Sequence, residues 1–220
     1  MRISVGFGIA VTAMLLSGSM AFSQIPVEVM AGDKMATLDL MFFRFFKNKE
    51  GASSGLLYFN RNRASMDYAM TQTSNLPQFG STNAFSWNPS FMKGLAPVVV
   101  CQIFGSGVFP KAGIQYALIR NNLTIFSWLV CETKQKPNLD FFFLARYTPA
   151  MTEKLNLFTQ LELIAAFPAD PSKNQVFTQR LRLGLKRKEF QFGLAADFSQ
   201  TGRNAFLATT NSGGFLRYEF

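Results

Sequence analysis

The sequence predicts an all-β fold, an antiparallel up-and-down transmembrane β-barrel of about twelve strands, with ten as the alternative. Three observations predict it. Residues 213–220 alternate between apolar and charged side chains and finish on Phe220, as expected of a last strand that must pair with the first. Residues 153–198 alternate in runs long enough for tilted strands to cross a bilayer. After residue 23 the longest apolar run, 94–101, is far below the ~20 residues of a spanning helix.

Composition favours a membrane surface over nucleic acid as the partner. The chain of 220 residues has 25 Phe and only 16% charged residues, and its formal net charge is +9 with a pI near 9.8. No Lys/Arg cluster is long enough to form a basic arm, so we expect no nucleic-acid partner. An anionic lipid surface suits this charge better.

The first residues, 1–23, are typical of a cleaved signal peptide. Arg2 precedes an apolar run, and Ala21-Phe22-Ser23 offers a small-x-small cleavage site. Export would follow. Residues 24–34 have a weak pattern and are expected to be a short lead, so that 35–220 form the barrel domain.

The next strands are taken in order. Residues 37–47 place four Phe around Arg44, which fits either an interfacial aromatic girdle or a Phe-rich core strand. Residues 55–72 are divided into two strands around Arg63; counted as one strand, they lead to the ten-stranded alternative. Further strands are predicted at 79–88, 95–104, 113–120, 123–132 and 139–148.

The most regular stretch is 153–198. Leu181, Leu183 and Leu185 share one face there, opposite Arg180 and Arg182. Turns near 121, 150 and 187 look short and loops near 107, 135, 170 and 206 longer, which predicts short turns at the end holding both termini.

Segments 94–104, 123–132 and 139–148 are apolar on both faces. An internal apolar core is the favoured explanation. A greasy path for a hydrophobic ligand and a bulged strand that hides its register remain open.

With these strands and the ending Tyr218-Glu219-Phe220, the chain resembles small Gram-negative outer-membrane β-barrel proteins. The resemblance covers nearly all of the mature chain, is architectural, and implies a location in the cell outer membrane. It implies that Tyr218 and Phe220 form the signal for the barrel-assembly machinery. It supplies no catalytic or ligand motif.

The sequence excludes several kinds of chemistry. It has no histidine, so the usual nucleophile–base pairs and His metal ligands are missing. We therefore expect no catalytic, cofactor or metal site, and no enzyme. Cys101 and Cys131 have one predicted strand between them, about 10 Å across the sheet, too far for a disulfide, so we predict free thiols.

The candidate site is the polar face of the last four strands, where charged side chains should point into the lumen. Its residues are Glu162, Arg180, Arg182, Asp197, Arg217 and Glu219. They could line a pore that favours anionic or zwitterionic solutes, or form a salt-bridged plug.

The loops expected outside are basic and could pair with lipopolysaccharide phosphates. They carry Lys47, Lys49, Lys134, Lys136, Lys173 and Arg203. A basic loop set that is merely solvated explains them nearly as well.

Three functions remain open. The first is a small channel or ligand-carrying barrel with a charged lumen. The second is a non-conducting structural or accessory subunit that contacts other outer-membrane proteins. The third, and least favoured, is a soluble exported β-sandwich.

Overall fold

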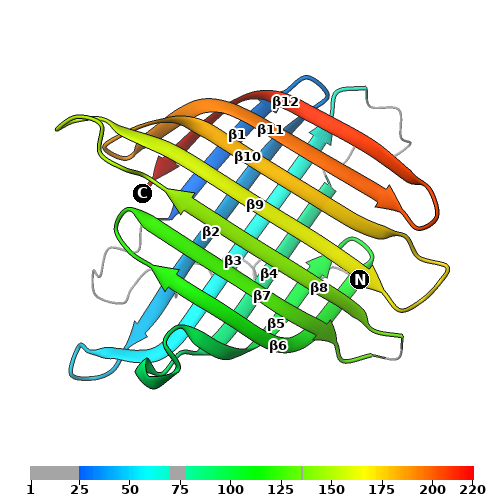
Figure 1. Ribbon diagram of the computed structural model, residues 1–220, viewed down its shortest axis with the longest axis horizontal. Coiled ribbons are helices and arrows are strands. Elements are labelled where there is room, and N and C mark those ends of the chain that lie inside the picture. Colours follow the sequence, from blue (N-terminus) through cyan, green and yellow to red (C-terminus); the bar gives the residue numbers. More distant parts are fainter. Residues whose placement is uncertain (1–24, 70–77, 135) are drawn as a thin grey trace, which may run out of the picture.

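The computed structural model describes residues 25–69, 78–134 and 136–220, which form one closed antiparallel barrel (Figure 1). Each strand pairs with its neighbours in sequence, and β1 pairs with β12 to close the sheet. The strands are β1 (Pro26–Gly32), β2 (Met35–Lys47), β3 (Ser53–Asp67), β4 (Gln78–Trp87), β5 (Leu95–Phe104), β6 (Gly107–Ile119), β7 (Leu123–Glu132), β8 (Asn138–Tyr147), β9 (Asn156–Pro168), β10 (Gln175–Arg187), β11 (Phe190–Gly202) and β12 (Phe206–Glu219). The predicted twelve-stranded barrel is confirmed, and closure rules out the sandwich.

The barrel closes through a strand that the sequence analysis did not expect. In β1, Pro26 pairs with Glu219 and Gly32 with Gly213 of β12, while the other edge of β1 pairs with β2. The barrel therefore begins at Pro26, inside the segment 24–34 that was expected to be a lead. Its inward face carries both Glu28 and Met30, so no simple polar/apolar alternation reveals the strand. The predicted signal peptide, 1–23, lies outside the described residues.

The division of residues 55–72 into two strands is wrong. Residues Ser53–Asp67 form the single strand β3, paired along its length with β2 and β4. The predicted count of twelve was reached because this extra strand compensated for the missing β1. Residues 70–72 of the predicted second strand lie outside the part that the structure describes.

The outer wall is apolar and the strands are long. β9, β10 and β11 have 13 residues each, enough to cross a bilayer when tilted. Large apolar side chains stand exposed around the wall, among them Val99, Ile114, Leu129, Leu183, Leu194 and Leu216. No helix in the described ranges is long and apolar enough to span a membrane.

Connection lengths do not alternate as predicted. At the end where β1 begins and β12 ends, here called the terminal end, the β10–β11 turn is short but the β8–β9 connection runs over 148–155. At the opposite end the β5–β6 turn, predicted to be long, is only Gly105 and Ser106. Lys49, in the β2–β3 connection, lies at the terminal end, as does Lys47 at the end of β2. The other loop cations, Lys134, Lys136, Lys173 and Arg203, lie at the opposite end.

The prediction of free thiols is confirmed. Cys101 on β5 and Cys131 on β7 are both free, and β6 runs between them. Cys101 pairs with Pro110 of β6, and Cys131 pairs with Ala112.

Candidate functional site

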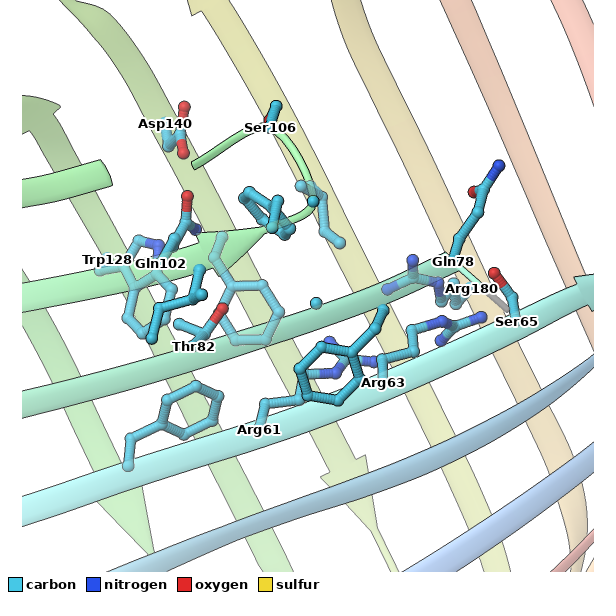
Figure 2. A pocket seen from close by; sticks show the side chains of 18 of the residues that line it. Arg61, Arg63, Ser65, Gln78, Thr82, Gln102, Ser106, Trp128, Asp140 and Arg180 are labelled. Atoms are coloured by element: carbon cyan, nitrogen blue, oxygen red, sulfur yellow. The ribbon is translucent and has the colours of Figure 1, made fainter. Parts of the chain in front are cut away.

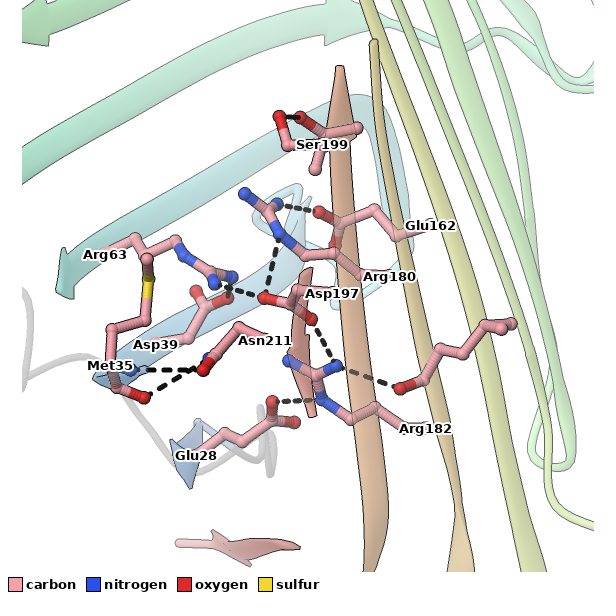
Figure 3. Close-up of polar contacts among 12 residues, drawn as sticks. Glu28, Met35, Asp39, Arg63, Glu162, Arg180, Arg182, Asp197, Ser199 and Asn211 are labelled. Carbon is pink, nitrogen blue, oxygen red and sulfur yellow. Dashed lines mark hydrogen bonds and ion pairs between the residues drawn. The ribbon is translucent and has the colours of Figure 1, made fainter. Parts of the chain in front are cut away.

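A layer of ion pairs crosses the middle of the barrel (Figure 3). Arg61 of β3 pairs with Asp39 of β2, and its Nη1 lies 2.8 Å from Glu162 Oε1 of β9 on the far wall. Arg180 of β10 also binds Glu162. A single carboxylate oxygen of Glu162, a residue 1% exposed, therefore joins guanidinium groups from both sides of the lumen.

The network continues through Asp197 of β11. Arg63 Nη2 lies 2.8 Å from Asp197 Oδ2, and Arg182 Nη1 lies 2.7 Å from Asp197 Oδ1. Arg182 Nε also donates to Glu28 Oε1 at 2.8 Å. Four arginines thus meet four carboxylates, and the layer is electrically balanced: Arg61, Arg63, Arg180 and Arg182 against Glu28, Asp39, Glu162 and Asp197.

The six predicted site residues all face the interior, in two groups. Glu162, Arg180, Arg182 and Asp197 belong to the central network. Arg217 and Glu219 lie nearer the terminal end, where Glu219 Oε2 accepts a hydrogen bond from Lys186 Nζ at 2.6 Å.

The sequence analysis missed the opposite half of the network, on β1, β2 and β3. Arg61 and Arg63 were obscured because their strand was divided in two, and Glu28 because its strand was not expected. Asp39 sits two residues before the inward Met41, so that the inward face of β2 is mixed. An unbroken alternation through Phe59, Arg61 and Arg63 was the signal that could have revealed β3.

The other half of the interior is an aromatic core. Phe59 stacks on Phe126 with ring centroids 5.3 Å apart, and Trp128 meets Phe59 edge-on at 5.2 Å. Phe142 of β8 and Phe43 of β2 complete the cluster. Val98 and Val100 are also buried, whereas Val99 is exposed on the wall. The favoured explanation of the strands apolar on both faces, an internal core, is therefore confirmed.

A cavity of about 770 Å³, here called the vestibule, lies at the end opposite the terminal end. Arg61, Arg63 and Arg180 line it together, and Figure 2 shows them grouped apart from Trp128. Phe59 and Phe142 join Trp128 in the apolar part of the lining. The vestibule thus offers guanidinium groups beside an aromatic wall.

A second cavity, of about 180 Å³, lies at the terminal end. Its lining includes Arg146, Lys186, Arg217 and Glu219, and it shares no described lining residue with the vestibule. Between the two cavities lie the ion-pair layer and the aromatic core, with Phe126 and Glu162 almost fully buried.

Tyr218 and Phe220 lie at the end of the last strand. Tyr218 contacts Phe190 of β11 and Phe220, each with ring centroids 4.7 Å apart. Phe220 is 72% exposed, so its ring is available to another protein.

An unexpected polar patch interrupts the apolar outer wall on β3 and β4. Asn60 lies between the inward Phe59 and Arg61, so its side chain is on the outside. Its Nδ2 donates to Asn83 Oδ1 at 2.8 Å, and Tyr58 Oη donates to the same oxygen at 2.7 Å. Asn62 Nδ2 donates to Asn60 Oδ1 at 2.7 Å. We call Tyr58, Asn60, Asn62, Ser81 and Asn83 the amide patch.

No protein-family model matches the chain, and no curated protein matches it. Among solved structures, it is similar to the KdgM porin in complex with disordered oligogalacturonate, at 12% identity and a TM-score of 0.48, over 90% of this chain and 99% of that one. It is similar to the NanC porin at 7% identity and a TM-score of 0.47, over 90% and 99%. It is also similar to outer-membrane expressed OmpT of Vibrio cholerae at 8% identity and a TM-score of 0.40, over 90% and 96%. Such values carry no argument about what this chain binds, but outer-membrane β-barrels are among its structural neighbours, as the sequence resemblance implies.

Proposed function

We propose that this protein is a ligand-carrying outer-membrane barrel, without enzymatic activity, that holds a small amphipathic anion in its vestibule. One observation carries the proposal. Three guanidinium groups, from Arg61, Arg63 and Arg180, line the vestibule beside aromatic rings, while the carboxylates that pair with them do not line it. Guanidinium groups bind carboxylate, sulfate or phosphate groups, and the aromatic wall suits an apolar body.

The filled interior favours a carrier over an open channel. The ion-pair layer and the aromatic core lie between two cavities that share no described lining residue. Small barrels are commonly filled by their own side chains. In planar bilayers we therefore expect no stepwise conductance from the native chain, and none from Arg180→Ala.

The vestibule is tested by ligand quenching of Trp128. The chain has two tryptophans, and Trp87 is on the outer wall, so Trp87→Phe leaves Trp128 as the only reporter. In lipid nanodiscs we expect 4-bromobenzoate to quench Trp128 saturably. Arg63→Gln should weaken binding about tenfold or more, since a charge-assisted hydrogen bond contributes about 1.5–3 kcal/mol.

Arg63 is chosen because its loss leaves both partners paired. Asp39 keeps Arg61, and Asp197 keeps Arg182, so the barrel should still fold. Arg203→Gln, at the rim of the same end and away from the vestibule lining, is the matched control and should bind normally. Quenching that rises linearly, or equally in Arg63→Gln, would contradict the proposed site.

The proposal extends to location and assembly. The apolar wall suits a bilayer, the predicted signal peptide at 1–23 would export the chain, and Tyr218 and Phe220 would be presented to the barrel-assembly machinery. With the terminal end in the periplasm, Lys134, Lys136, Lys173 and Arg203 would meet lipopolysaccharide.

The amide patch favours a second candidate function, an accessory subunit of a larger outer-membrane complex. Amide groups facing lipid are costly unless they are hydrogen-bonded, and Asn62 Oδ1 has no hydrogen-bond partner among the described residues. A protein partner in the bilayer would supply one.

A photo-crosslinking amino acid at position 62 tests this second candidate. In native membranes we expect a discrete protein adduct from position 62. Position 194 on β11, where Leu194 is 71% exposed, is the matched control and should give none. Equal adducts from the two positions, or lipid adducts alone, would remove the amide patch as a contact surface.

A further inference from the structure

Two guanidinium groups at the terminal end converge on one neutral acceptor. Arg146 Nε of β8 donates to Gln160 Oε1 at 2.9 Å, and Arg217 Nη1 of β12 donates to the same oxygen at 3.3 Å. Arg146 Nη2 and Arg217 Nε and Nη2 are buried without a hydrogen-bond partner among the described residues. Arg217 is only 2% exposed, so bulk water cannot solvate it fully.

The charges around this pair do not balance. Lys186 also lines the cavity, and among the described lining residues Glu219 is the one carboxylate. Glu219 is already bound by Lys186 at 2.6 Å and lies 3.7 Å from Arg217 Nη2. The nearby Glu28 is paired with Arg182 at 2.8 Å.

The rest of the chain cannot supply the missing negative side chain. The residues outside the described ranges, 1–24, 70–77 and 135, include no Asp or Glu. A buried cation without a counter-charge is strongly destabilising. A mobile anion from solution or from a lipid would remove this imbalance.

We propose that the terminal-end cavity is a binding site for a phosphate group. Two guanidinium forks and an ammonium group match the oxygens of a phosphate, and guanidinium binds it in bidentate fashion. The volume of about 180 Å³ equals about six water molecules in the liquid, which suits a small oxyanion. Asn121, Asn122 and Thr124 add polar groups to the lining. This site is separate from the vestibule and does not depend on the function proposed for it.

Inorganic phosphate is the first probe. In detergent micelles at constant pH and ionic strength, calorimetric titration should show saturable binding at about one site per chain, and phosphate should raise the unfolding temperature. Arg146→Gln should weaken phosphate binding about tenfold or more. Lys186→Gln is a second variant in case the first folds poorly, and heat-modifiable gel migration reports folding of each.

Arg120→Gln is the matched control, because it removes a cation from the same rim without touching the cavity lining. Dihexanoyl phosphatidylglycerol, titrated below its micelle concentration, distinguishes a lipid phosphate from free phosphate. Binding of either probe that is lost in Arg146→Gln and kept in Arg120→Gln supports the site and identifies its source. Absence of binding by both probes, or equal affinity in all variants, overturns it.

Discussion

Replacing Glu162 by glutamine is expected to lower the free energy of unfolding of the barrel by about 3 kcal/mol. The near-isosteric change keeps the shape and removes the charge that joins Arg61 to Arg180. The expected loss is at the lower end of values for a broken buried ion pair, because Arg61 keeps Asp39 and Arg180 keeps Asp197. Urea unfolding in lipid vesicles, followed by heat-modifiable gel migration, measures it.

Glu50→Gln is the control, since Glu50 is exposed in the β2–β3 connection and should change stability by less than about 0.5 kcal/mol. The double variant Glu162→Gln/Arg180→Gln restores the charge balance. It should therefore be more stable than the sum of the two single losses predicts. If Glu162→Gln behaved like Glu50→Gln, solvent rather than Glu162 would be compensating the two arginines.

Replacing Phe126 by alanine is expected to cost about 3–5 kcal/mol of stability. Phe126 is 0% exposed, and its ring contacts those of Phe43, Phe59, Trp128 and Phe142 at centroid distances of 4.9–6.0 Å. The truncation would leave a void inside the barrel that rigid strands cannot close. The same urea unfolding assay measures the loss.

Phe91→Ala removes the same ring from the rim, where Phe91 is 74% exposed, and should have little effect. A small loss for Phe126→Ala would mean that water or neighbouring rings fill the space without strain. The aromatic core would then not be the element that keeps the lumen closed.

The sequence predicts the second half of the barrel well because polar and apolar side chains separate cleanly there. Arg180 and Arg182 alternate with Leu181 and Leu183, and the structure has the same register. In β3 the inward Arg61 and Arg63 alternate with the outward Asn60 and Asn62, so both faces are polar. Periodicity alone cannot identify such a strand.

The ion pairs across the lumen could not be predicted from periodicity at all. Arg61 and Glu162 are 101 positions apart in the sequence, and they meet only because closure brings β3 opposite β9. Which residues meet depends on strand tilt and stagger, which local patterns do not encode. The sequence could therefore predict which side chains point inward on β9 to β12, but not their partners from β1 to β3.

The short strand β1 has a consequence for how this wall is held together. It has 7 residues, between β2 with 13 and β12 with 14, so the cylinder is sealed along about half its height by this joint. Beyond Gly32 the Asn211 side chain takes over, accepting from the Lys34 and Met35 amides and donating to the Met35 carbonyl. An asparagine thus acts as a rivet where backbone pairing stops, and the joint is where the finished wall would part first.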